Sequence, residues 1–126
     1  MRSLARLLHV TIIASAVAVA AALSATPAAA APTLIYANVG PGYSITLKTA
    51  GGVAIRTLRA GRAYTVVVKD QSGIHNFRLT GAGVSRATGI AFVGTVRWNV
   101  TFRAGTYTYV CDPHESMTGT VRATTS

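Results

Sequence analysis

The chain has 126 residues, half of them hydrophobic, and a formal net charge of +9 from 12 basic and 3 acidic side chains. The three acids are Asp70, Asp112 and Glu115, too few for catalysis by paired carboxylates or for a calcium loop rich in Asp and Glu. A chain of this length forms one domain at most, and its apolar fraction argues against intrinsic disorder.

The N-terminal thirty residues have the layout of a secretory signal peptide. Arg2 and Arg6 form a basic start, Leu7–Leu23 is almost entirely apolar, and Ala28–Ala30 offers small residues for cleavage. We predict a signal peptide over residues 1–30 and cleavage after Ala30, which would place the protein outside the cytosol, secreted or in a periplasm. An uncleaved membrane anchor stays open as an alternative, because the apolar run is near the lower limit for a membrane span.

Residues 31–126 would then form the mature domain of 96 residues (126 − 30). Without Arg2 and Arg6, ten basic and three acidic side chains remain, a net charge of +7. Small secreted domains often rely on disulfides, but Cys111 is the only cysteine and has no partner within the chain. A lone thiol in an oxidising compartment is buried, paired with another chain or bound to a metal.

The mature domain reads as β-structure throughout. The segment Thr95–Arg103 is the clearest strand, because apolar and polar residues alternate along it. Glycine-containing turns separate the strand candidates, and no stretch shows a helical period. About eight short strands with this spacing predict an antiparallel sandwich or a small Greek-key barrel. In chain order, the predicted strands are Leu34–Val39, Tyr43–Thr49, Val53–Leu58, Ala63–Lys69, Ile74–Thr80, Thr95–Arg103, Thr106–Cys111 and Thr118–Ala123.

Metal-binding side chains gather directly after one of these strands. Cys111, His114 and Met117 supply a thiol, an imidazole and a thioether within seven residues, and Pro113 bends the chain between them. His75, from a distant segment, would complete a set of two His and one Cys with a weak axial Met, which is typical of electron-transfer copper sites. Each residue alone is more simply explained by packing, but together they favour copper.

The sequence also resembles a known family. Val67–Phe77 and Ala104–Gly119 look like the plastocyanin/amicyanin branch of the cupredoxins, with Cys-x-x-His-x-x-Met in the short, amicyanin-like form. The resemblance covers about the last two-thirds of the mature chain. It implies a Greek-key β-sandwich of about seven to eight strands, and it assigns Asn76 to a side-chain tie between the two ligand loops. It further implies one copper ion bound by His75, Cys111 and His114 as equatorial ligands and Met117 as the axial ligand.

Two carboxylates depart from the family pattern. Asp112 and Glu115 lie inside the ligand loop, where a negative charge could stabilise Cu(II) or recruit a different ion. The reduction potential therefore does not follow from the resemblance.

The ligand set predicts an electron carrier rather than an enzyme, because four protein ligands leave no open position for a substrate. The resemblance implies that His114 lies near the surface as the route of the electron. Three alternatives stay open. They are a Cys111/His114 nucleophilic dyad, for which no oxyanion motif is present, a zinc site with the same ligands, and a copper-binding module for storage, delivery or sensing.

The basic charge predicts the kind of partner. The basic residues are scattered and not interleaved with stacking aromatics, which argues against nucleic acid. An acidic redox partner protein or an anionic envelope surface fits better, and we expect a monomer. They include Arg56, Arg59, Arg62, Lys69, Arg78, Arg86, Arg97 and Arg103.

Overall fold

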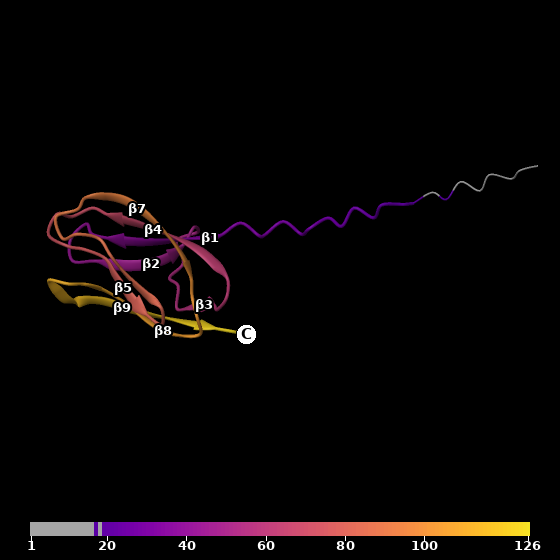
Figure 1. The fold of residues 1–126 in the computed structure, drawn as a ribbon. Helices are drawn as coiled ribbons and strands as arrows, with labels where there is room; N and C mark the ends of the chain where they lie inside the picture. The colour runs from indigo at the N-terminus through magenta and orange to yellow at the C-terminus, as the bar shows by residue number, and fades with distance from the viewer. Residues whose placement is uncertain (1–16, 18) are drawn as a thin grey trace, which may run out of the picture.

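The computed structural model describes residue 17 and residues 19–126. The basic start of the predicted signal peptide and most of its apolar run lie outside the described residues. Residues 19–32 are exposed, have no regular secondary structure and lead away from the folded part (Figure 1). In the part of the chain that the structure describes, no helix is long and apolar enough to cross a membrane.

The described residues form nine strands and no helix, which confirms the all-β prediction. Most strands lie within two residues of a predicted one, because alternation and turn glycines mark them in the sequence. In chain order they are β1 (Thr33–Val39), β2 (Ile45–Thr49), β3 (Thr57–Arg59), β4 (Ala63–Asp70), β5 (Arg78–Gly81), β6 (Val84–Ala87), β7 (Gly94–Thr101), β8 (Gly105–Cys111) and β9 (His114–Thr124).

The strands form two sheets that pack as a sandwich (Figure 1). One sheet has four strands in the order β2-β1-β4-β7, and the other has five in the order β3-β9-β8-β5-β6. Two pairings are parallel, β1 with β4 and β3 with β9, while the other named pairs are antiparallel. The chain crosses between the sheets several times, so segments distant in sequence meet at each end of the sandwich.

The core lies between the sheets and is built from the inward-facing residues of each strand. On β7, Val96, Trp98 and Val100 face the core while Arg97 and Asn99 are exposed, as the alternation predicts. Burial of these apolar side chains is the main stabilising contribution to such a fold. Among the residues with essentially no exposed surface are Ala37, Val39, Val66, Val68, Phe77, Leu79, Phe102, Tyr107 and Cys111.

The predicted strand Val53–Leu58 is wrong in its extent, because this segment changes sheets midway. Ala54 forms an isolated bridge with Lys48 of the four-stranded sheet, whereas Thr57 pairs with Arg122 of the other sheet. The chain bends between Ala54 and Thr57 to change sheets, so only β3 remains as a regular element.

The prediction is also wrong for Ile74–Thr80 and incomplete after Gly83. Regular pairing begins only at Arg78, so His75 lies in the connection between β4 and β5 rather than on a strand. The edge strand β6 was not predicted, because three of its four residues are exposed and no alternation marks it. The strand predicted to begin at Tyr43 begins at Ile45, which leaves Tyr43 in a loop.

Candidate metal centre

The hairpin between β8 and β9 brings Cys111 and His114 together. Cys111 is the last residue of β8 and His114 the first of β9, and the two pair directly across the ladder. Only Asp112 and Pro113 lie between them, and the proline ring fixes one backbone dihedral of this turn. Residues that pair across antiparallel strands point to the same side, so the thiol and the imidazole share one face of the hairpin.

An irregularity of β9 follows this turn. Val110 pairs with Thr118, whereas the next residue of β8, Cys111, pairs with His114. Residues 115–117 therefore have no partner in the ladder, and such an insertion bends a strand and re-aims its side chains. Met117, the last of the three, is 3% exposed and belongs to the same core cluster as Cys111.

His75 reaches the hairpin from the connection between β4 and β5. Its backbone N–H donates to the carbonyl of Ser72 in a 3.3 Å hydrogen bond, which closes a turn. The imidazole is 1% exposed, although it lies on a loop. Neighbouring residues therefore cover His75 almost completely and restrict the position of its side chain.

The side chains of His75, Cys111 and His114 converge on one point. The two Nδ1 atoms lie 2.9 Å apart, and the Cys111 Sγ lies 3.6 Å from each of them. Among the described His, Cys, Asp and Glu residues, these three form the group whose ligand atoms approach closely enough to share an ion, all within 4.8 Å of one another. The structure thus brings together three of the four predicted site residues, and it places Met117 in the adjoining core.

This donor set fits a metal ion. All three distances are short enough for each atom to reach one ion at metal–ligand distances of about 2.0–2.3 Å. Two imidazole nitrogens and one thiol sulfur suit a borderline or soft ion such as copper or zinc, and no carboxylate oxygen of the described residues joins them. The candidate centre lies at one end of the apolar core, where His75 and Cys111 are buried and His114 is partly exposed.

The buried polar residues of the described chain all lie around this centre. They are Asp70, His75, Asn76 and Thr88, each less than one-tenth exposed. Buried polar groups need hydrogen-bond partners, because an unpaired group loses its hydration without compensation. Their concentration at one end of the sandwich indicates a built site rather than a packing accident.

Hydrogen bonds connect three of these residues in a chain. The Asp70 carboxylate accepts from the Thr88 hydroxyl at 3.3 Å, and that hydroxyl accepts from the backbone N–H of Phe77 at 2.9 Å. The Asn76 amide donates to the Thr88 carbonyl at 3.1 Å. The loop that carries His75 is therefore held by Thr88, in the connection between β6 and β7, instead of by a strand ladder.

Asn76 also joins the two ligand loops, as the family resemblance implies. Its Oδ1 accepts from the backbone N–H of Asp112 at 2.7 Å, and its Nδ2 donates to the Asp112 carboxylate at 2.8 Å. Asn76 follows His75, and Asp112 follows Cys111, so these two bonds fix the separation between the two ligands.

The carboxylate of Asp112 is engaged away from the ligand atoms. Arg78 donates to it through Nε at 2.7 Å and through Nη2 at 2.8 Å, a paired geometry that suits guanidinium and carboxylate. The hydrogen bonds from Arg78 lower the pKa of Asp112, partial burial opposes this shift, and the Asn76 bond adds to the lowering. Glu115 is exposed on β9. Neither acid belongs to the cluster of ligand atoms, and the influence of their charge on a bound ion stays a prediction.

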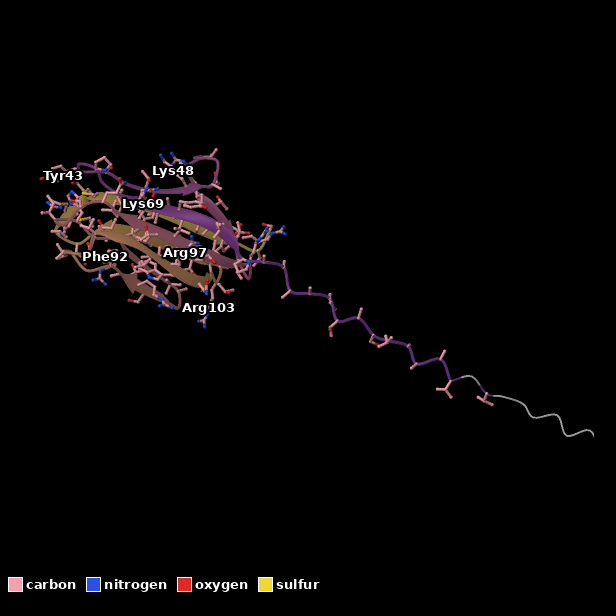
Figure 2. The ribbon with its side chains drawn as sticks, turned by 90° about the horizontal axis from the view of Figure 1, so that it is seen from above. Tyr43, Lys48, Lys69, Phe92, Arg97 and Arg103 are labelled. Atoms are coloured by element: carbon pink, nitrogen blue, oxygen red, sulfur yellow. The ribbon has the colours of Figure 1, made fainter. Side chains whose placement is uncertain are left out.

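Sequence reasoning missed Tyr43, which packs against both imidazoles. Its ring meets that of His75 edge-on at 5.1 Å and that of His114 at 4.9 Å, yet it is 70% exposed. Tyr43 lies at the end of the sandwich opposite the N-terminal segment (Figure 2). It covers the candidate centre on its solvent side and leaves His114 partly exposed. No sequence signal links this loop tyrosine to histidines so distant along the chain. Arg78 was missed for the same reason.

Three comparisons with known proteins bear on the site. No protein-family model matches the chain, and no curated protein matches it in sequence. Among solved structures, the chain is similar to the copper protein rusticyanin, with a TM-score of 0.55 at 22% identity, over 72% of this chain and 76% of that one. Reduced rusticyanin gives a TM-score of 0.55 at 24% identity, over 76% of this chain and 82% of that one. Rusticyanin from Thiobacillus ferrooxidans gives a TM-score of 0.54 at 23% identity, over 72% of this chain and 76% of that one.

At this level of identity the likeness concerns the fold. It supports the cupredoxin-like architecture expected from the sequence, while membership of the plastocyanin/amicyanin branch stays a prediction. The chain thus has an all-β sandwich fold similar to that of a copper protein, with a His-Cys-His cluster at one end.

Proposed function

We propose that this protein binds one copper ion and carries single electrons between partner proteins outside the cytosol. His75, Cys111 and His114 are the main ligands, and Met117 is a weak fourth ligand. The observation that carries the proposal is the triangle of two imidazole nitrogens and one sulfur, with sides of 2.9, 3.6 and 3.6 Å, in which His75 and Cys111 are buried. The similarity of the fold to a copper protein supports the same metal.

The protein's contribution is to hold the ligand atoms still. Copper would supply a one-electron couple, Cu(I)/Cu(II). The Asn76–Asp112 bonds and the buried Thr88 hold the two ligand loops, so little rearrangement of the side chains would accompany a change of charge. His114, partly exposed beside Tyr43, is the route for the electron. A centre closed by four protein ligands has no position for a substrate, which favours a carrier over an enzyme.

The same proposal includes export. The sandwich begins at Thr33, shortly after the predicted cleavage at Ala30, and residues 19–32 make no part of it. Removal of the first thirty residues would therefore leave every strand intact. A single buried cysteine kept for a metal fits an oxidising compartment, where an exposed thiol would be oxidised. The protein acts there as a monomer that meets its partners transiently.

Redox cycling of the copper-loaded protein tests this function. We expect repeated, fully reversible one-electron reduction and oxidation with ascorbate and ferricyanide, and one copper per chain retained after dialysis at each stage. Cys111→Ser should lose both the tight binding and the reversible couple, because it lacks the thiolate. Loss of copper on reduction, with transfer to an apo-protein, would instead identify a module for copper delivery or storage.

A further inference from the structure

A groove of about 410 Å³ lies on the outer face of the four-stranded sheet, and none of the candidate ligands lines it. Its lining comes from β1, β2 and β4, with one residue of β7 and part of the turn after β2. Both lysines of the chain, Lys48 and Lys69, are among the lining residues. Tyr36, Asn38 and Thr95 add a phenol, an amide and a hydroxyl, so the groove is rich in hydrogen-bond donors.

The register extends this basic surface by one further residue. Tyr36 pairs with Lys48 on one side and with Val67 on the other, and Val67 pairs with Arg97. Lys48 and Arg97 therefore flank the same row of the sheet, and Lys69 belongs to the adjacent row. We call Lys48, Lys69 and Arg97 the basic face. Figure 2 shows all three between Tyr43 at one end and the N-terminal segment at the other.

No acidic side chain balances the basic face. All three acids of the sequence are described, and each lies elsewhere. Asp70 is buried, Asp112 is paired with Arg78 at the β8–β9 turn, and Glu115 is exposed on β9 of the other sheet. Among the described residues, no hydrogen bond is made by the side chains of Lys48, Lys69 or Asn38. The face thus presents positive charge and donors that water alone satisfies.

The basic face adjoins the end of the sandwich that holds the ligands. Lys69 pairs with Thr95, and the next pair along β4 and β7 is Asp70 with Gly94, where both strands meet the loops of the centre. These loops expose apolar side chains, namely Tyr43, Ile74 and Val93. A charged strip that leads into an exposed apolar patch has the composition of a transient docking surface, with a polar rim that steers and an apolar centre that excludes water.

We propose that the basic face, together with this apolar end, docks an acidic surface of the partner protein that exchanges electrons with this one. This inference rests on the proposed function, and it adds the face and the chemistry of the partner. Carboxylate side chains of a protein can enter a groove on the face of the sheet and pair with Lys48 and Lys69, whereas a flat anionic bilayer would not reach into it. Arg78 lies beside the centre but is paired with Asp112, and other arginines lie away from it. Arg59 and Arg122, for example, lie on β3 and β9 at the opposite end.

Nuclear magnetic resonance of the ¹⁵N-labelled protein with a poly-glutamate peptide tests the docking face and needs no copper. We expect the largest chemical-shift changes at residues 36–38, 48–50, 67–69 and 95, and their loss as salt is raised to shorten the Debye length. The double variant Lys48→Glu with Lys69→Glu should raise the dissociation constant about tenfold or more at low salt. Lys48→Gln with Lys69→Gln, a milder change, should act in the same direction.

The matched control reverses two charges elsewhere. Arg59→Glu with Arg122→Glu changes the net charge equally, and it should leave the chemical-shift map and the affinity within about twofold of the original. Equal weakening by both double variants would show that only total charge matters and would overturn the proposal. So would binding to phosphatidylglycerol vesicles without binding to poly-glutamate. If poly-glutamate binds at the basic face but the copper-loaded protein does not cycle electrons, the docking face is supported and the proposed function is refuted.

Discussion

The backbone N–H of Asp112 donates a 2.7 Å hydrogen bond to the side chain of Asn76, which lies 36 positions earlier in the chain. Each of these residues directly follows a predicted metal ligand, Cys111 in one case and His75 in the other. The separation of the ligands is therefore set by the polypeptide itself. We infer that the site is preformed and that a metal enters it without refolding the loops.

Asn76→Ala tests this preformed arrangement. The substitution leaves the buried Thr88 carbonyl and the part-buried Asp112 N–H without their partner, which should destabilise the apo-protein by about 1–3 kcal/mol. It should also broaden the visible band of the copper-loaded protein, because the ligand loops would vary in separation. Asn99→Ala is the matched control, since Asn99 makes one hydrogen bond on the exposed surface of the sheet. Equal effects of the two substitutions in urea unfolding would contradict the account.

The pairing of Arg78 with Asp112 predicts a dependence on pH. Because Arg78 lowers the pKa of Asp112 in the folded state, the pair stabilises the protein fully above the ordinary carboxyl pKa. This contribution is lost as the pH falls through the lowered folded-state pKa. The free energy of unfolding of the apo-protein, measured in urea, should therefore fall on acidification, and Asp112→Asn should flatten that decline. If the variant loses stability with falling pH as steeply as the original protein does, the pair contributes nothing.

Candidate ligands could be named from the sequence because their chemistry is local. Cys111, His114 and Met117 fall within seven residues, and alternation in segments such as β7 reveals which side chains face inward. What escaped prediction depends on partners distant in sequence. The loop of His75 looked like a strand, but the ladder is replaced there by hydrogen bonds that Thr88 accepts and one that the Asp112 N–H donates. The packing of Tyr43 on the two imidazoles arises only when β1, β4 and β8 meet at one end.

Met117→Gln tests the fourth ligand. A thioether stabilises soft Cu(I), so replacing it with a harder oxygen donor should keep the copper but lower the reduction potential. Voltammetry of the two proteins under one set of conditions measures the change. A potential equal to that of the original would mean that Met117 serves the core alone, in keeping with its burial there.

Copper should stabilise a domain that folds without it. The sandwich has its own apolar core, so we expect a folded apo-protein with a lower melting temperature than the copper-loaded form. A metal that joins His75 to Cys111 closes a loop of 36 residues, for which a covalent link would give about 3–4 kcal/mol as an upper guide.

To separate copper binding from the stability of each variant itself, the rise in melting temperature on adding copper is measured for each protein against its own apo form. Cys111→Ser should show little rise, whatever its own stability, because it lacks the thiolate. A rise as large as in the original protein would place the copper on other groups. An apo-protein that is unfolded would instead identify a domain whose folding requires the metal.

The central claim is that Cys111, His75 and His114 bind Cu(II) together, and the visible absorption spectrum of the copper-loaded protein tests it most directly. Charge transfer from the Cys111 thiolate to Cu(II) should give an intense visible band that disappears on reduction with ascorbate and is absent in Cys111→Ser. A colourless protein that holds one Cu(II) per chain would contradict the account, because the copper would then lie away from the thiolate.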